Sequence, residues 1–416
     1  MSLIRPFAAL RPAPGRAQEV IAPPYDVLNT AEARVLAEGR PWSFLHISKP
    51  EIDLPADTDP YAPEVYRKAA DNLRHMLAEG VLKQDDRPCY YAYRLIMGEH
   101  TQTGLVAAAS VADYDTNRIR KHEFTRPDKE DDRVRQIEAL NAQTGPVLLA
   151  YPAQAEVDAI LAAATQHAPD QDGVGESGVR HTLWVIHDAA TVARLTELFD
   201  NLPALYIADG HHRSAAASRV CAARKVASLA AGAGHTGEES YNYFLTVIFP
   251  HDQMRILDYN RVVKDLSGLS EAAFLDKLAG AFAVEDAPGP VSPARPGEFG
   301  LYLSGRWRKL TIKPALIPAD PVGRLDVSLL QDNLIAPILG IADPRRDKRI
   351  DFVGGIRGLA ELEKRVNSGE MALALSLHPT RMEDLMAVAD ANEVMPPKST
   401  WFEPKLADGM ASHMLD

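Results

Sequence analysis

The fold and the candidate site of this chain both follow from residues 205–217, which read LYIADGHHRSAAA. The apolar residues Leu205 to Ala208 predict a buried strand. Asp209 and Gly210 end that strand, and an alanine-rich run predicts a helix that begins at once and continues to about residue 232. A strand that turns directly into a helix is typical of α/β proteins, and a glycine at such a turn lets the backbone approach a ligand closely.

The polar side chains of this turn suit an anionic ligand. A helix N-terminus favours negative charge, and Arg213 in the first turn can contact a phosphate through two nitrogen atoms. His211 and His212 offer proton transfer or metal ligation. The sequence leaves open that Asp209 only caps the helix and that both histidines are solvated. We favour a functional interpretation, with three catalytic residues, Asp209, His211 and His212, and two phosphate-binding residues, Gly210 and Arg213.

Strand and helix patterns alternate on both sides of the turn. Before it we expect strands at 44–47, 89–97, 103–114, 147–151 and 181–187, and helices at 61–80, 155–167 and 190–199. After it we expect strands at 243–249, 350–353 and 372–377, a strand pair at 301–312, and helices at 327–339 and 381–392. This alternation predicts a mixed α/β (α+β) fold with the phosphate-binding turn inside a larger mixed sheet.

A proline-rich stretch marks a predicted boundary between two domains. Four prolines fall between residues 285 and 300, and such a segment is a candidate linker or surface loop. We therefore expect an α/β domain at residues 1–285 that carries the site. We expect a C-terminal α/β region at residues 297–416 that packs back on it.

Composition excludes several classes of protein. The 416 residues are 46% hydrophobic and 25% charged, which is ordinary for a globular protein, and the net charge of -12 argues against a nucleic-acid partner. Cys89 and Cys221 match no zinc or redox spacing and indicate a reducing compartment. No apolar run approaches the ~20 residues that span a membrane. We expect a cytoplasmic protein with a small-molecule substrate and no membrane partner, of open oligomeric state.

A second polar cluster lies between Arg120 and Arg126. Cations and a carboxylate packed this closely suit a phosphate clamp beside a general base. We predict that Lys121 binds the cofactor, that His122 contacts substrate and that Glu123 is catalytic. The charged run after Pro127 is typical of a solvated helix start, and that explanation remains open for the whole cluster.

Two proline-flanked segments complete the candidate site. Two prolines precede Tyr25 and Asp26, and this rigid backbone can form a pocket wall in which both side chains bind substrate. Near the C-terminus, Lys398 and Ser399 follow two further prolines and are candidates for phosphate binding. A rigid helix-capping turn in the first case, and a stiff segment anchored by Trp401 in the second, are equally compatible with the sequence.

The motifs together resemble a known family. The matching pieces are Ile4 to Phe7, Pro23 to Val27, Lys121 to Glu123 with Thr125, Asp209 to Arg213, and Met395 to Thr400. Across nearly its full length the chain resembles the uncharacterised DUF1015 family, and its Asp-Gly-His-His-Arg turn resembles that of the ParB/sulfiredoxin superfamily, which includes free serine kinases. The resemblance implies nucleotide phosphates at the turn, with ATP or ADP and Mg²⁺ as cofactors and serine or phosphoserine as substrate.

Three functions remain open at this stage. The first is a phosphotransfer enzyme of the serine kinase type, with phosphates held at the turn of residues 209–213. The second is a metal-assisted phosphatase, in which Asp209, His211 or His212 holds a divalent ion. The third is a nucleotide-sensing protein without turnover.

Overall fold

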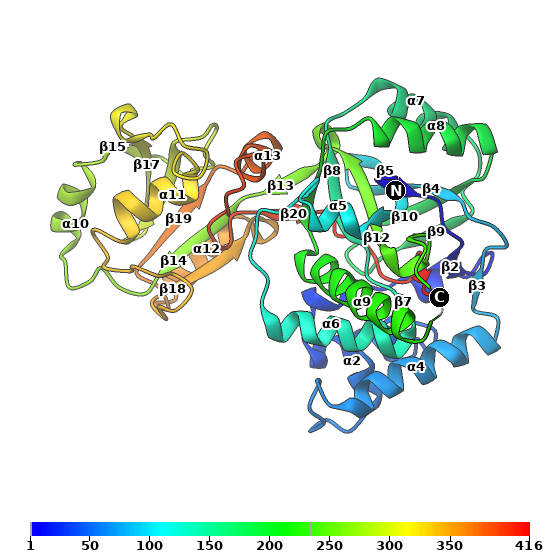
Figure 1. Ribbon diagram of the computed structural model, residues 1–416. Helices are drawn as coiled ribbons and strands as arrows, with labels where there is room; N and C mark the ends of the chain where they lie inside the picture. Colours follow the sequence, from blue (N-terminus) through cyan, green and yellow to red (C-terminus); the bar gives the residue numbers. More distant parts are fainter. Residues whose placement is uncertain (1, 233) are drawn as a thin grey trace. The chain divides into compact units, whose positions relative to one another are not determined.

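The structure is a computed structural model that describes residues 2–232 and 234–416. The chain divides into two compact units: Met1–Met254 together with Pro404–Asp416 form the first, and Arg255–Glu403 form the second (Figure 1). This division differs from the boundary expected at residues 285–297. The proline-rich segment lies inside the second unit, between β15 (Phe282–Ala287) and β16 (Glu298–Leu303), both of which pair with β17 (Arg306–Ile312). Its prolines therefore mark a connection within one sheet.

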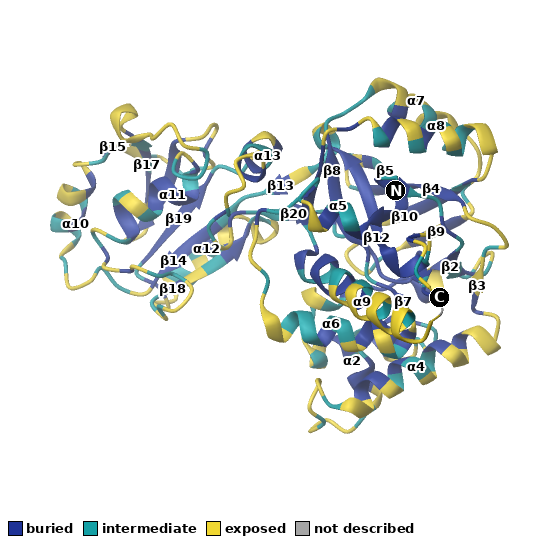
Figure 2. Ribbon diagram, viewed as in Figure 1, coloured by how far each residue is buried: buried dark blue, intermediate teal, exposed yellow. Residues whose placement is uncertain are grey.

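A mixed sheet forms the centre of the first unit, as the alternating pattern predicted. β1 (Ile4–Arg5) pairs with β5, and the remaining strands follow this order: β6 (Ile119–Arg120), β11 (Leu205–Asp209), β8 (Val147–Tyr151), β12 (Tyr243–Pro250), β5 (His100–Ser110), β4 (Tyr90–Met97), β10 (Arg180–Ile186), β9 (Gln171–Val174). The pairs β11–β6 and β12–β8 are parallel, and the other pairs are antiparallel. The strands are mostly buried (Figure 2).

Some helices pack on this sheet through apolar stripes, and others pack against those helices. α7 (Ala155–Ala164) packs beside α8 (Ala189–Asp200), and α6 (Pro127–Leu140) packs against α9 (His211–Ala230) and α4 (Pro63–Ala78). α4 shows why these segments are helical: Pro63 occupies its first turn, and Val65, Ala69, Leu73 and Met76 recur at intervals of three or four on its buried face. Helices and strands at 61–80, 89–97, 147–151, 155–167, 181–187 and 190–199 were predicted within a few residues.

Three segments differ from the sequence-based prediction. Residues 45–47 form part of a helix, α3 (Leu45–Ser48), because a mostly apolar segment of four residues does not distinguish a buried strand from a buried helix. β5 ends at Ser110, whose hydroxyl accepts from the amide of Asp113 and starts α5 (Val111–Asp115). The helix expected at 327–339 is α11 (Asp326–Leu330) followed by a π-helical turn, Gln331–Ile335.

The C-terminal tail belongs to the first unit. A four-stranded sheet has the order β3 (Leu82–Gln84), β2 (Ala9–Pro12), β21 (Ser412–Met414), β7 (Ala142–Gln143). Upstream of β21, an isolated bridge pairs Asp408 with Ala22. These pairings fix the last residues of the chain against its first segment.

The second unit is built on an antiparallel sheet of order β15-β17-β16-β19-β14-β18, in which β19 is Leu373–Leu377, β14 is Tyr259–Val263 and β18 is Ile350–Gly354. Its helices are α10 (Glu271–Leu278), α11, α12 (Gly358–Asn367) and α13 (Met382–Asp390), and a small ribbon joins β13 (Arg255–Leu257) to β20 (Trp401–Glu403). Across both units, no helix among the described residues is long and apolar enough to cross a membrane.

Candidate active site

Gly210 sets the geometry of the turn between β11 and α9. It precedes the first helical residue with a φ of 97°, a conformation that other residues rarely adopt. A Cβ atom at this position would lie 3.2 Å from Nε of Arg213 and 3.3 Å from Cα of Val147. The glycine therefore provides both the left-handed turn and the space in which the arginine side chain folds back beside the strand.

Both histidines of the turn hold the loop that carries the second polar cluster. Nε2 of His211 accepts a hydrogen bond from the amide of His122 at 3.4 Å. Nε2 of His212 accepts one from the amide of Arg126 at 3.1 Å. The start of α9 thus holds the loop between β6 and α6 at two points, through contacts between residues 89 and 86 positions apart in sequence, and the two polar clusters meet in one place.

Glu123 projects from this loop toward His211. Its Oε2 lies 3.7 Å from Nδ1 of His211, and its side chain is 59% exposed whereas that of His211 is 4% exposed. Burial lowers the pKa of His211 well below the ordinary value, with the nearby His122 adding to the effect, so the ring is neutral at pH 7. Because Nε2 accepts the amide hydrogen bond, the single ring proton resides on Nδ1 and faces the carboxylate.

His122 completes a compact group at this point. Its ring meets that of His211 edge to face with centroids 4.5 Å apart, and burial lowers the pKa of His122 to about 4. One ligand atom each from His122, Glu123 and His211 lie within 4.8 Å of one another, a spacing that a metal ion could use. The hydrogen bond at Nε2 of His211 argues against a metal ion here. A metal ion bound to Nδ1 would leave the ring proton on Nε2, where it would face the amide N–H of His122, whereas metal-bound histidines direct that proton toward an acceptor.

Asp209 lies between two cations. Nζ of Lys405 donates to its Oδ2 at 3.1 Å, and Nη2 of Arg213 lies 3.9 Å from its Oδ1. Burial alone would raise the pKa of Asp209, but the charges of Lys405 and Arg213 outweigh it and hold that pKa well below the ordinary value. The carboxylate is therefore ionised at every physiological pH, and it stays 36% exposed at the surface of the site.

Arg213 joins the turn to the Tyr25–Asp26 segment. Its Nη2 lies 3.4 Å from Oδ2 of Asp26, and its Nη1 donates to the carbonyl of Pro146. Tyr25 packs under the guanidinium of Arg133, with 3.8 Å between Cζ and the ring centroid, and burial raises the pKa of Tyr25 to about 12. The first unit thus brings the predicted residues Tyr25, Asp26, Asp209 and Arg213 together.

Three other predicted residues make different contacts. Nζ of Lys121 lies 4.0 Å from the ring centroid of Tyr114 on α5, a contact directed at that helix. Lys398 and Ser399 belong to the second unit, where Nζ of Lys398 lies 5.5 Å from the ring centroid of Tyr259 and Oγ of Ser399 donates to the carbonyl of Pro396. For all three, a role in cofactor binding stays a prediction.

Two residues of the C-terminal tail that the sequence motifs did not indicate also lie at the site. Lys405 pairs with Asp209, and Asp408 is buried beside Gly145, where an added Cβ would lie 3.9 Å from its Oδ1. Lys405 follows the predicted Lys398–Trp401 segment closely, which is the one signal that pointed to it. Asp408 had none, because an isolated aspartate gives no pattern.

The match to a family model decides the chain's affiliation. The model of a family described as "Protein of unknown function (DUF1015)" matches residues 4–328. The chain is a DUF1015 protein. No curated protein matches this DUF1015 chain.

Solved structures similar to this DUF1015 protein include a free serine kinase in complex with AMP, a conserved hypothetical protein from Pyrococcus furiosus, and SbnI with a C-terminal truncation from Staphylococcus aureus. Their sequence identities are 11%, 14% and 12%, and their TM-scores are 0.32, 0.34 and 0.34. The alignments cover 72%, 76% and 73% of this chain and 86%, 97% and 85% of the others.

Proposed function

We propose that this protein transfers a phosphoryl group from a nucleotide to the hydroxyl of a small amino-acid or anionic metabolite, of which serine is the first candidate. The observation that carries the proposal is the convergence of Glu123, on a loop held by two histidines, with the helix start at Gly210 and Arg213. Phosphoryl transfer needs positioning and charge neutralisation more than covalent chemistry, and this arrangement can supply both.

Each residue has a distinct part in the proposed reaction. The helix N-terminus and Arg213 hold the phosphates. The acceptor hydroxyl oxygen attacks the terminal phosphorus, the bond from that phosphorus to the nucleotide oxygen breaks, and the hydroxyl proton passes to Glu123. His211 positions Glu123, because its Nδ1 proton faces the carboxylate at 3.7 Å. Asp26, which is 39% exposed, is available to attract an acceptor ammonium group.

The proposed cofactors are ATP or ADP together with Mg²⁺. Asp209 and Glu123 offer carboxylate oxygens, the ligand type that Mg²⁺ prefers. Bound Mg²⁺ would neutralise phosphate charge. Three carboxylates, Asp26, Glu123 and Asp209, lie near the cations Arg213, Arg133 and Lys405, and the phosphates of a nucleotide would add further negative charge, which favours a bound Mg²⁺.

Lys398 and Ser399 are proposed as further phosphate ligands. Lys398 has a φ of 59°, and its carbonyl accepts from Nη2 of Arg261 at 3.1 Å, so the segment that carries it is firmly fixed. Lys398→Met keeps most of the side-chain stem and removes the charge. Weaker nucleotide binding in this variant would support the role, and wild-type affinity would leave the segment as a structural clasp.

A metal-assisted phosphatase is the second candidate, favoured by the spacing of His122, Glu123 and His211. The two functions predict different reactants. Purified protein incubated with ATP or ADP, Mg²⁺ and L-serine should form phosphoserine if it is a kinase. Release of phosphate from phosphoserine without nucleotide would indicate the phosphatase. Nucleotide binding without either reaction would indicate a sensor and overturn the proposal.

Two variants separate binding from chemistry. Glu123→Gln should abolish turnover and leave the affinity for nucleotide without Mg²⁺ intact, because it removes the proton acceptor and a proposed Mg²⁺ ligand but no phosphate-binding group. Arg213→Ala should weaken nucleotide affinity by roughly 1.5–3 kcal/mol, the range for hydrogen bonds to charged groups. Arg194→Ala is the matched control, since Arg194 pairs with Glu156 on the surface away from the turn. Unchanged calorimetric affinity in Arg213→Ala would contradict the phosphate-binding turn.

A further inference from the structure

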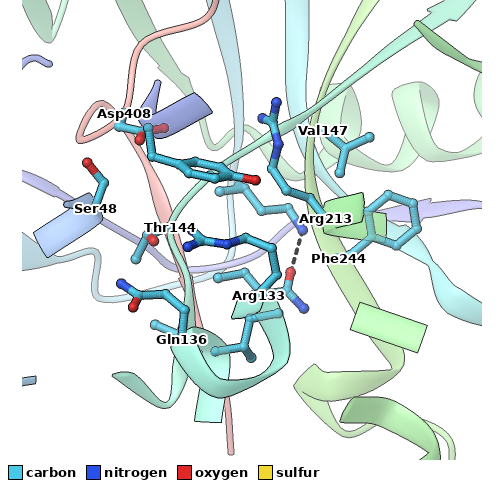
Figure 3. A pocket seen from close by; sticks show the side chains of 14 residues that line it. Ser48, Arg133, Gln136, Thr144, Val147, Arg213, Phe244 and Asp408 are labelled. Atoms are coloured by element: carbon cyan, nitrogen blue, oxygen red, sulfur yellow. Dashed lines mark hydrogen bonds between the residues drawn. The ribbon is translucent and has the colours of Figure 1, made fainter. Parts of the chain in front are cut away.

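A small cavity with both polar and apolar walls lies behind Arg213 in the first unit. It has a volume of about 30 Å³, and its walls include Ser48, Arg133, Gly145, Arg213 and Asp408 (Figure 3). Because one water needs roughly 10–15 Å³ in this measure, the space accommodates two or three atoms of that size. These walls come from α3, α6, the start of α9, the segment before β8 and the C-terminal tail, so the cavity exists only in the folded unit.

Three buried polar atoms around this cavity have no hydrogen-bond partner among residues 2–232 and 234–416: Oγ of Ser48, Nε of Arg213 and Oδ1 of Asp408. Their side chains are well buried, with Ser48 at 6% and Asp408 at 2% exposed and the side chain of Arg213 at 10%. Buried polar groups are almost always hydrogen-bonded, and one that is not costs about 1–3 kcal/mol. Three such atoms at one cavity indicate a polar ligand.

The charges around the cavity favour an anionic group over a cation. Two guanidinium groups, those of Arg133 and Arg213, line it. Arg133 is satisfied by Asp132 at 2.6 Å, whereas the carboxylates nearest Arg213 lie at 3.4 and 3.9 Å and leave its Nε unused. The cavity volume fits the three heavy atoms of a carboxylate group better than the five of a phosphate group.

We propose that this cavity binds the carboxylate group of the small-molecule acceptor, with Nε of Arg213 and the hydroxyl of Ser48 as donors. The assignment of the ligand as the acceptor rests on the proposed phosphotransfer function. Arg213 spans the two regions: it lines the cavity and its buried Nε has no partner among the described residues, while its Nη2 lies 3.4 Å from Asp26 and 3.9 Å from Asp209, which are 39% and 36% exposed. The remainder of an amino or hydroxy acid therefore lies toward the open turn.

Asp408 makes this binding sensitive to pH. The charged or titratable groups that face it are Arg213, Asp26, Arg133, Tyr93 and Tyr25, the last of which also donates its backbone amide. Burial raises the pKa of Asp408 to about 7, and Arg213 opposes that rise only in part. Protonated Asp408 does not repel a ligand carboxylate and can donate to it, so binding should take up a proton and weaken as the pH rises from 6 to 8.

Calorimetry without nucleotide tests the site directly, with acetate, L-serine and ethanolamine as probes. Ethanolamine keeps the amine and hydroxyl of serine but lacks the carboxylate. We expect acetate and L-serine to bind more tightly at pH 6 than at pH 8, and ethanolamine not to bind. Binding of ethanolamine as tightly as L-serine, or binding of neither carboxylate at either pH, would overturn the proposal and leave a cavity for water only.

A pair of serine variants separates ligand binding from stability. Ser48→Ala removes an unpartnered buried hydroxyl, so it should leave or raise the melting temperature yet weaken L-serine binding about tenfold or more. Ser328→Ala is the matched control, because Ser328 is also 6% exposed with an unpartnered hydroxyl among the described residues, but lies in the second unit. Asp408→Asn should abolish the pH dependence of binding. Equal affinity of Ser48→Ala and wild type would contradict the site.

The failure of this proposal can be distinguished from failure of the proposed function. Carboxylate binding that depends on Ser48, in a protein that never transfers phosphate, would sustain the cavity assignment and overturn the reaction. Phosphoryl transfer to L-serine with an unchanged KM for serine in Ser48→Ala would sustain the reaction and overturn the cavity assignment.

Discussion

His212 accepts a hydrogen bond from the backbone amide of Arg126, with 3.1 Å between Nε2 and N. The donor lies 86 residues earlier in the chain, at the end of the loop that carries Glu123. In the fold, His212 fixes the far end of this loop, and His211 fixes the near end at His122; proton transfer by His212 stays a prediction.

His212→Ala should lower kcat/KM by roughly tenfold to a hundredfold, because a loosened loop misplaces Glu123. His212→Gln is the matched variant, since its side-chain carbonyl can accept from the same amide and should restore much of the activity. Hydrogen exchange at residues 121–126 should rise in the alanine variant alone. Equal loss of activity in both variants, with no change in exchange, would instead indicate proton transfer by the imidazole.

Gly210→Ala should destabilise the protein by more than the cost of its backbone conformation. An alanine with positive φ costs roughly 1–2 kcal/mol, and the new Cβ would also press on Arg213 at 3.2 Å. Gly98→Ala isolates the first effect, because Gly98 also has a positive φ, of 60°, but meets no atom within 4 Å among the described residues. Thermal unfolding should show the larger loss for Gly210→Ala, together with weaker nucleotide binding. Equal losses would mean that the arginine can move aside freely.

Lys405→Met should shift the acid limb of the rate profile to higher pH. The lysine helps hold the pKa of Asp209 below its ordinary value of 3.8, so its removal lets that pKa rise and the carboxylate becomes protonated at a higher pH. Lys313→Met serves as the control, since Lys313 donates only to the carbonyls of Ala279 and Gly280 among its hydrogen bonds to described residues. A profile that matches wild type would show that Asp209 has no part in the reaction.

The free energy of unfolding should begin to fall at a pH well above the pH range in which ordinary carboxylates are protonated. Burial lowers the pKa of His122, His181 and His413 to about 4, from 6.5 in an unfolded chain. Between these values the unfolded state binds more protons, so each histidine removes about 1.4 kcal/mol of stability per pH unit as the pH falls from 6.5 to 4. Denaturant titrations at several pH values measure this slope.

His181→Gln should reduce the slope of the free energy of unfolding against pH by the contribution of one histidine. His181 lies away from the turn, and its Nδ1 lies 2.7 Å from the hydroxyl of Tyr93, so the change leaves the candidate site intact. Asp408 acts in the opposite direction: burial raises its pKa to about 7, so the folded state holds its proton between pH 3.8 and 7 and its contribution is lost as the pH rises. A stability that is flat from pH 6.5 to 4 in wild type would contradict the burial of neutral histidines.

Local patterns in the sequence determined the elements that carry the site. The apolar run before Asp209 predicted β11, and the alanine-rich run after Gly210 predicted α9, because the periodicity of apolar side chains depends only on neighbouring residues. The mixed α/β class followed from the alternation of such runs. The segment at 44–47 was misassigned because four residues, three of them apolar, are too few to show a helical or strand period.

The tertiary structure alone decided what those elements do together. No local pattern indicates that His212 would bond to the amide of Arg126 or that Lys405 would pair with Asp209, 196 residues earlier, because these contacts depend on how β21 and the mixed sheet fold the chain back on itself. The cavity lined by Ser48 and Asp408 arises in the same way. Sequence specifies which groups are available, and long-range packing specifies which of them are buried, whose charges they feel and where each proton resides.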